Sequence, residues 1–149
     1  MKKIITLLAA TLLITACGPK KEVTIPDRPK TEEEFKAVFK EAYDSGKTDQ
    51  IFDLIDLSNS GSDFKEILKG ITTSYAGIHK VQTIEFIPYE PDPMMPMEMN
   101  GKKIEATIEP TYWFICDTAA TDKEETGQIK TAVGRDSKGS LAFCGMRYQ

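Results

Sequence analysis

Residues 81–87 have the sequence VQTIEFI, and they mark the point at which the chain changes from helical to strand patterning. β-branched and aromatic residues favour strands, and Pro88 ends the run because proline cannot donate a ladder hydrogen bond. Before this stretch the apolar residues recur at helical spacing, and after it they mostly alternate. This order predicts an α+β domain, with two or three N-terminal helices packed on a curved, mainly antiparallel sheet.

Three helices are expected before residue 81. The first begins with a capping box, in which Thr31 and Glu34 each satisfy a backbone donor, and it ends at Gly46. The second is expected over residues 48–57, and the third begins at residue 62 or 63 and fades near residue 76. On the first and third helices we expect an apolar stripe that faces the core: Phe35, Val38, Phe39, Ala42 and Tyr43, then Phe64, Ile67, Leu68 and Ile71.

The strands after residue 88 are separated by turn signals. Asn100-Gly101 is typical of a type I′ hairpin turn, because both residues tolerate a positive φ. Pro110 indicates a bulge or an edge position within the next strands. We expect these strands over residues 102–109, 112–118, 128–133 and 140–148.

The first seventeen residues have the layout of an export signal. Lys2 and Lys3 precede an apolar run over residues 4–14, which is too short to cross a bilayer as a helix. Ile14-Thr15-Ala16-Cys17 resembles the lipobox of bacterial lipoproteins. The resemblance implies that residues 1–16 are removed as a signal peptide and that the Cys17 thiol carries a diacylglyceryl group. Two or more acyl chains, palmitate among them, would anchor the protein stably in a membrane.

The same resemblance implies a place in the bacterial cell envelope. In enteric bacteria an aspartate after the lipidated cysteine resembles an inner-membrane retention signal, so Gly18 implies the outer membrane if the host is Gram-negative. Residues 17–30 are polar and contain three prolines, which predicts a lipidated N-terminus followed by a flexible tether. Residues 31–149 are expected to form a single α+β domain.

Charge and motifs exclude several classes of function. The chain has 23 acidic and 19 basic side chains, and two of the basic ones lie in the signal. A mildly acidic chain without a clustered basic face is not typical of a nucleic-acid-binding protein. No phosphate-binding glycine loop or catalytic serine, zinc or dithiol motif occurs, and we predict no cofactor.

Two residue types could still carry chemistry. His79 is the only histidine, and we expect it at a surface or a helix end rather than in a catalytic role. Met94, Met95, Met97 and Met99 are weak candidates for copper(I) ligands, because thioethers are soft donors. Packing or contact with a partner is the favoured role of these methionines, and no metal site is predicted.

Cys116 and Cys144 remain once Cys17 is assigned to the lipid. An oxidising compartment and an even number favour a disulfide. A meander of the last three strands opposes it, since both cysteines would flank the middle strand near Ile129, about 9.6 Å apart. A disulfide requires Cα atoms within about 7 Å, so the disulfide is slightly less favoured than two buried thiols.

The order of elements over residues 31–148 resembles the cone-shaped fold of the nuclear transport factor 2-like superfamily. The resemblance implies a curved sheet around a cavity, which enzymes of that superfamily line with aspartate, histidine or tyrosine. Such residues are scarce at the inward positions here. The favoured hypothesis is therefore a non-enzymatic, lipid-anchored envelope protein that binds a partner protein or a small ligand. The alternatives are a cone-fold enzyme and a copper-handling lipoprotein that uses the methionines.

Overall fold

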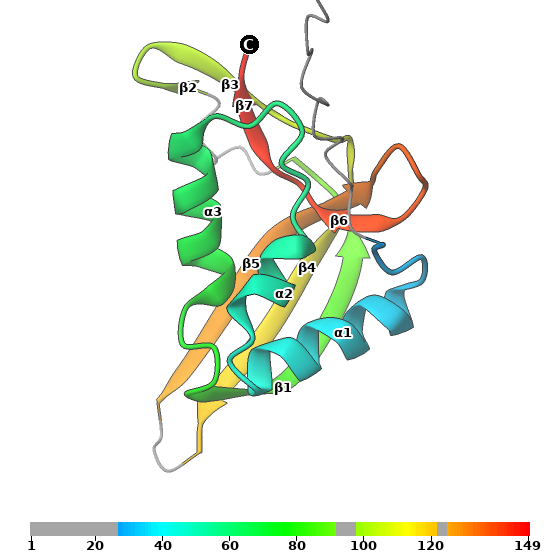
Figure 1. Cartoon of the computed structure of the whole chain (residues 1–149), viewed down its shortest axis with the longest axis vertical. Helices are drawn as coiled ribbons and strands as arrows, with labels where there is room; N and C mark the ends of the chain where they lie inside the picture. Colours follow the sequence, from blue (N-terminus) through cyan, green and yellow to red (C-terminus); the bar gives the residue numbers. More distant parts are fainter. Residues whose placement is uncertain (1–26, 92–97, 122–124) are drawn as a thin grey trace, which may run out of the picture.

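The computed structural model describes residues 27–91, 98–121 and 125–149. Three helices lie on one face of a four-stranded antiparallel sheet, and a smaller three-stranded sheet stands at one end (Figure 1). The predicted α+β class is therefore confirmed. The predicted signal peptide and Cys17 lie outside the described residues.

Helix α1 (Glu32–Asp44) begins with the predicted capping box. Glu34 N–H donates to the Thr31 hydroxyl at 3.2 Å, and the Glu34 carboxylate accepts the Thr31 N–H at 3.4 Å. Its buried stripe consists of Phe35, Phe39, Ala42 and Tyr43. Val38 was expected in this stripe, but its side chain is 40% exposed, because it projects from the side of the stripe over a surface groove.

Helix α2 (Thr48–Asp53) ends earlier than predicted. The chain after Asp53 pairs with the C-terminal part of the protein: Phe143 N–H donates to the Leu54 carbonyl and Asp56 N–H donates to the Phe143 carbonyl, both at 2.8 Å. These long-range hydrogen bonds replace the helical ones that residues 54–57 would make.

Helix α3 (Ser62–Thr73) lies as predicted, but its buried stripe differs from the expected one. Phe64, Leu68 and Thr72 face the core. Ile67 and Ile71 are 41% and 45% exposed, so the prediction that they face the core was wrong. No helix of the described residues is long and apolar enough to span a bilayer.

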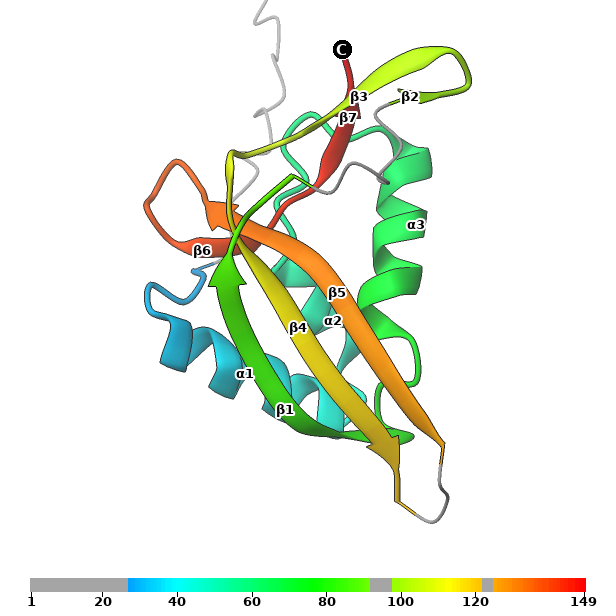
Figure 2. The ribbon, with the colours of Figure 1, turned by 180° about the vertical axis from the view of Figure 1, so that it is seen from behind.

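The larger sheet has the order β1-β4-β5-β6. Its strands are β1 (His79–Pro88), β4 (Pro110–Ala120), β5 (Thr126–Arg135) and β6 (Leu141–Phe143). All neighbours are antiparallel, and the register shifts between Pro110 and Tyr112, where a bulge was predicted. Figure 2 shows the long, twisted strands β1, β4 and β5 from the face opposite the helices.

The smaller sheet has the order β2-β3-β7. Its strands are β2 (Glu98–Met99), β3 (Lys102–Ala106) and β7 (Met146–Tyr148). Asn100 and Gly101 join β2 to β3 with φ values of 55° and 72°, which confirms the predicted hairpin turn.

The last predicted strand, over residues 140–148, is divided between the two sheets. β6 pairs with β5, whereas β7 pairs with β3. The division falls at Gly145, where a Cβ would lie only 2.0 Å from the Asp56 carbonyl oxygen. Because only glycine fits this close approach, the chain can change direction here and enter the second sheet.

The core is built around a cluster of aromatic rings. Phe35 and Phe39 of α1 make edge-to-face contacts with Phe114 of β4 and Phe143 of β6, with centroids 4.9–5.8 Å apart. Such pairs are more favourable than their buried area alone, and they fix α1 across the sheet.

Candidate functional site

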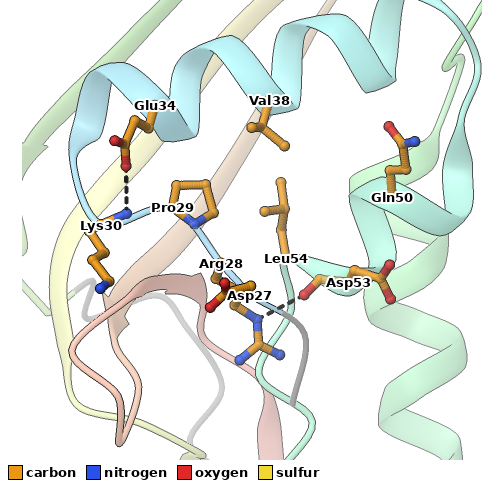
Figure 3. Close-up of a pocket in the computed structure, with 9 residues that line it drawn as sticks. All are labelled: Asp27, Arg28, Pro29, Lys30, Glu34, Val38, Gln50, Asp53 and Leu54. Carbon is orange, nitrogen blue, oxygen red and sulfur yellow. Dashed lines mark hydrogen bonds between the residues drawn. The ribbon is translucent and has the colours of Figure 1, made fainter. Parts of the chain in front are cut away.

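A groove of about 550 Å³ opens between residues 27–30, α1 and α2 (Figure 3). One wall is the segment that precedes α1, and the floor lies between the two helices. The lining side chains are Asp27, Arg28, Pro29, Lys30, Glu34, Val38, Gln50, Asp53 and Leu54.

Arg28 anchors the wall of the groove to the domain. Its Nε donates to the Asp53 carbonyl and its Nη2 to the Ile55 carbonyl, each at 2.8 Å. Its Nη1 forms an ion pair with Asp136 at 3.1 Å, in which the side chains of Arg28 and Asp136 are only 6% and 4% exposed. The charge of Arg28 is thus neutralised within the fold, so the groove does not offer this cation to an anionic ligand.

The floor of the groove is apolar and its rim carries carboxylates. Val38 and Leu54 point toward one another in Figure 3, with Pro29 beside them. Apart from the Arg28–Asp136 pair, the rim carries three carboxylates and one ammonium group. The carboxylates belong to Asp27, Glu34 and Asp53, and the ammonium group belongs to Lys30. This combination favours a ligand that joins an apolar body to a positive charge.

The segment that walls the groove was expected to be part of the tether, which the prediction extended to Lys30. Besides the Arg28 contacts, Leu141 N–H donates to the Pro29 carbonyl at 2.7 Å and Arg135 donates to the Lys30 carbonyl at 3.2 Å. Residues 28–30 are therefore packed on the domain.

The predicted methionine site is only partly within the described residues. Met94, Met95 and Met97 lie outside them, and Met99 belongs to β2, where it pairs with Lys102. No three histidine, cysteine or carboxylate side chains of the described ranges are grouped so that they could hold a metal ion. Copper binding by these methionines stays a prediction.

Cys116 and Cys144 are buried free thiols in this structure. Cys116 lies opposite Ile129, as the meander predicted. Cys144 was expected opposite the same residue, but its N–H donates to the Ala132 carbonyl, because the turn between β5 and β6 is centred later in the chain and Val133 lies opposite Phe143. Burial raises the pKa of both thiols to about 12, which disfavours the thiolate that nucleophilic chemistry requires.

His79 is buried rather than exposed at a helix end. The residue is 1% exposed, and its Nδ1 lies 3.2 Å from the Thr118 hydroxyl oxygen. Nε2 has no hydrogen-bond partner among the described residues, and the Tyr75 ring stacks on the imidazole at 4.6 Å. The groove and His79 do not share lining residues, so the geometry does not make His79 a catalytic base for the groove.

Comparisons of the chain with protein-family models, curated proteins and solved structures find no match. The resemblances to lipoproteins and to the nuclear transport factor 2-like cone stay predictions.

Proposed function

We propose that this chain is a lipid-anchored protein of the bacterial cell envelope whose domain binds a ligand without transforming it. The lipobox-like Ile14-Thr15-Ala16-Cys17 supports the anchor. The groove supports the binding role, because Asp136 neutralises the buried Arg28 and leaves the apolar floor and the carboxylates of the lining to a ligand.

The observation that carries the proposal is the arrangement of the groove. An apolar floor of Val38 and Leu54 lies beneath a rim with an excess of carboxylates. An apolar ligand with an ammonium or guanidinium group would bury its body on this floor and place its charge at the rim. The ligand class is therefore a cationic, partly apolar molecule or the corresponding side chains of a partner protein.

A pair of probes tests this proposal. A short amidated peptide of leucine and lysine is titrated into the detergent-solubilised mature protein, and the methyl signals of Val38 are followed by NMR. A leucine–glutamate peptide of equal length is the control. We expect the lysine peptide to shift the Val38 signals and to bind at least about tenfold more tightly than the glutamate peptide.

The charge of the rim is tested by Asp53→Asn, which keeps the backbone carbonyl that Arg28 uses. We expect it to weaken binding of the lysine peptide several-fold, about the effect of one exposed charge. Asp49→Asn is the matched control, because it makes the same change on α2 outside the groove lining. Equal binding of both peptides, or equal effects of the two variants, would refute the proposal.

A further inference from the structure

Strand β5 pairs with a neighbouring strand along its whole length on one side only. β4 pairs with it from Thr126 to Gly134, whereas β6 pairs only with its end, at residues 133–135. Among the described strands, none pairs with residues 126–131 on the β6 side. The first half of β5 is thus an open sheet edge in the described part of the chain.

The backbone hydrogen bonds between β5 and the chain after β6 show which backbone groups of β5 point toward this edge. The Ala132 carbonyl accepts the Cys144 N–H at 2.8 Å, so the backbone of Ala132 points to the β6 side. Backbone groups alternate along an antiparallel strand, and the N–H and C=O of Gln128 therefore point the same way. The Gln128 side chain is used on the outer face, where its amide donates to Asp117 at 2.8 Å.

Helix α3 extends beyond this edge. In both Figure 1 and Figure 2 it lies beside β5, on the side away from β4. Four large apolar side chains on α3 and the turn after it are exposed, by 41% to 66%, and we call them the α3 apolar row: Ile67, Ile71, Tyr75 and Ile78.

The α3 apolar row lies on the side of α3 away from α2. Successive helical residues are about 100° apart, so Ile67 and Lys69 lie on opposite sides of the buried Leu68. The Lys69 ammonium lies over the Phe52 ring of α2, 5.6 Å from its centroid. The Ile67 side therefore faces away from α2.

Contacts at the end of the row place it next to β5. The Tyr75 ring stacks on His79, and a Cβ on Gly127 of β5 would lie 3.7 Å from Nδ1 of that histidine. Tyr75 adopts a φ of 58°, which is costly for a bulky residue. His79 Nε2, which is buried and has no hydrogen-bond partner in the described part of the chain, lies at this same end of the edge.

The opposite edge of the sheet, on β1, is closed by its own neighbours. The Val81 N–H donates to the Asp44 carboxylate at 2.7 Å, and the Val81 carbonyl accepts from Lys40 at 3.1 Å. A register shift follows between Val81 and Thr83, and Pro88 lacks an N–H. Such features protect an edge from strand addition. The part of β5 before residue 132 has no register shift against β4 and contains no proline.

We infer that the β5 edge and the α3 apolar row together form a docking surface for an extended segment of a partner protein. The segment adds a strand to β5 through the backbone of Gln128. Every second side chain of the segment packs beneath the α3 apolar row, and the others face outward with Gln128. This surface is separate from the groove and does not depend on the proposed function.

The overhang of α3 favours a single strand over a second copy of this chain. An added strand needs about 4.8 Å beside β5. If the β5 edge of a second copy paired with this β5, the α3 of that copy would lie over the same pair of strands. Two packed helices need about 8–10 Å between their axes. The space beside β5 therefore suits one strand with no helix of its own.

Charge specifies the outward positions of the segment. Lys130 lies on the outer face of β5, with its ammonium 4.5 Å from the centroid of the Trp113 ring. Acidic side chains at the outward positions complement this lysine across the new strand pair. The partner chemistry is thus an extended segment in which β-branched apolar residues alternate with polar residues that include glutamate.

The test uses a defined peptide of seven residues, in which valine and isoleucine alternate with threonine and glutamate. It is titrated into the detergent-solubilised mature protein, and amide hydrogen exchange is measured by NMR. We expect exchange at Gln128 to slow by at least about tenfold at saturation, as for an amide that gains a ladder hydrogen bond. A peptide with lysine in place of glutamate is expected to bind more weakly.

Two pairs of variants distinguish a loss of binding from a loss of folding. Gln128→Pro removes the outward N–H but no bond to β4, and we expect it to weaken binding at least about tenfold. Gln128→Ala loses the same bond to Asp117 and keeps the N–H, so it should bind as the wild type does. Ile71→Glu should also weaken binding about tenfold, whereas Ile87→Glu, at an exposed position on β1, should not.

Several results would overturn the inference. These are no binding at millimolar peptide, protection at Ile84 and Phe86 of β1 instead of Gln128, or equal binding by Gln128→Pro and Gln128→Ala. Protection of Gln128 that rises with protein concentration alone would assign the edge to a second copy. If Gln128→Pro does not fold, the comparison of Ile71→Glu with Ile87→Glu decides the question.

Discussion

Gly46 and Gly77 touch through their backbones. A Cβ on Gly77 would lie 3.0 Å from the Gly46 Cα, and both residues have positive φ, at 69° and 80°. The Gly77 N–H also donates to the Tyr43 carbonyl at 2.7 Å. This contact holds the end of α1 against the turn that leads from α3 into β1.

Gly77→Ala should therefore destabilise the domain. The new Cβ meets backbone that cannot move aside, and the positive φ is unfavourable for alanine, so we expect a loss of about 1–3 kcal/mol in the free energy of unfolding. Gly70→Ala is the control, because among the described residues no atom beyond its chain neighbours and the backbone of α3 lies within 4 Å of its Cβ position. Urea unfolding should show that variant unchanged or more stable by about 0.5–1 kcal/mol. Equal effects of the two substitutions would contradict the close contact.

Arg28→Ala should cost about 3–5 kcal/mol, because it leaves the buried Asp136 carboxylate without its cation. Lys47→Ala removes the exposed pair with Glu41 instead, and about 0–1 kcal/mol is expected. Both are measured by urea unfolding of the mature protein. A similar small effect at both positions would mean that residues 28–30 do not belong to the stable fold.

The proposed lipid anchor predicts that Cys17→Ser prevents lipidation. The variant is expected in the soluble envelope fraction or as an uncut precursor, because one step of processing depends on the modified thiol. Membrane fractionation and intact mass together measure this. Recovery of Cys17→Ser in the membrane fraction with residues 1–16 already removed would refute the lipid anchor.

The buried thiols predict a loss of stability in alkaline solution. In the folded protein the pKa of Cys116 and Cys144 is about 12, whereas thiols of the unfolded chain ionise near about 8.5. Between these values the unfolded state binds fewer protons, so the free energy of unfolding falls as the pH rises. The variant carrying Cys116→Ala and Cys144→Ala should show a shallower fall in its urea midpoint from pH 8 to 11. An equal slope in both proteins would contradict the burial of the thiols.

Phe39→Ala should cost about 3–5 kcal/mol, as large aromatic deletions in a core do. Its ring lies 4.9 Å from the Phe114 centroid and is fully buried. Val38→Ala, at the neighbouring exposed position, should change the melting temperature little. A melting temperature of Phe39→Ala within a degree of the wild type would place the α1 stripe outside the core.

Features that depend on neighbouring residues were predictable from the sequence. Thr31 and Glu34 form their capping box within one helical turn, and Asn100-Gly101 forms its hairpin between adjacent strands. Gly145 could not be assigned in the same way, because the atom that excludes a side chain there belongs to the distant Asp56. The division of the last strand therefore follows from tertiary packing.

The candidate groove was missed for the same reason. Arg28 lies in a polar, proline-containing stretch that is typical of a tether, and its ion-pair partner is 108 residues away. The periodicity of α3 likewise shows that Ile67 and Ile71 are apolar positions, but it does not show that the helix extends past the edge of the sheet. Whether an apolar position on α3 is buried or exposed depends on where α3 lies relative to β5.

The attachment of residues 28–30 also has a mechanical consequence. A force that enters the domain through residue 27 meets the Arg28 contacts and the Pro29–Leu141 hydrogen bond before it reaches α1. Tension is therefore carried into the end of α2 and the turn between β5 and β6, and it reaches α1 only after these contacts break. The first unfolding event under load is expected to be release of this short segment, with the rest of the domain intact.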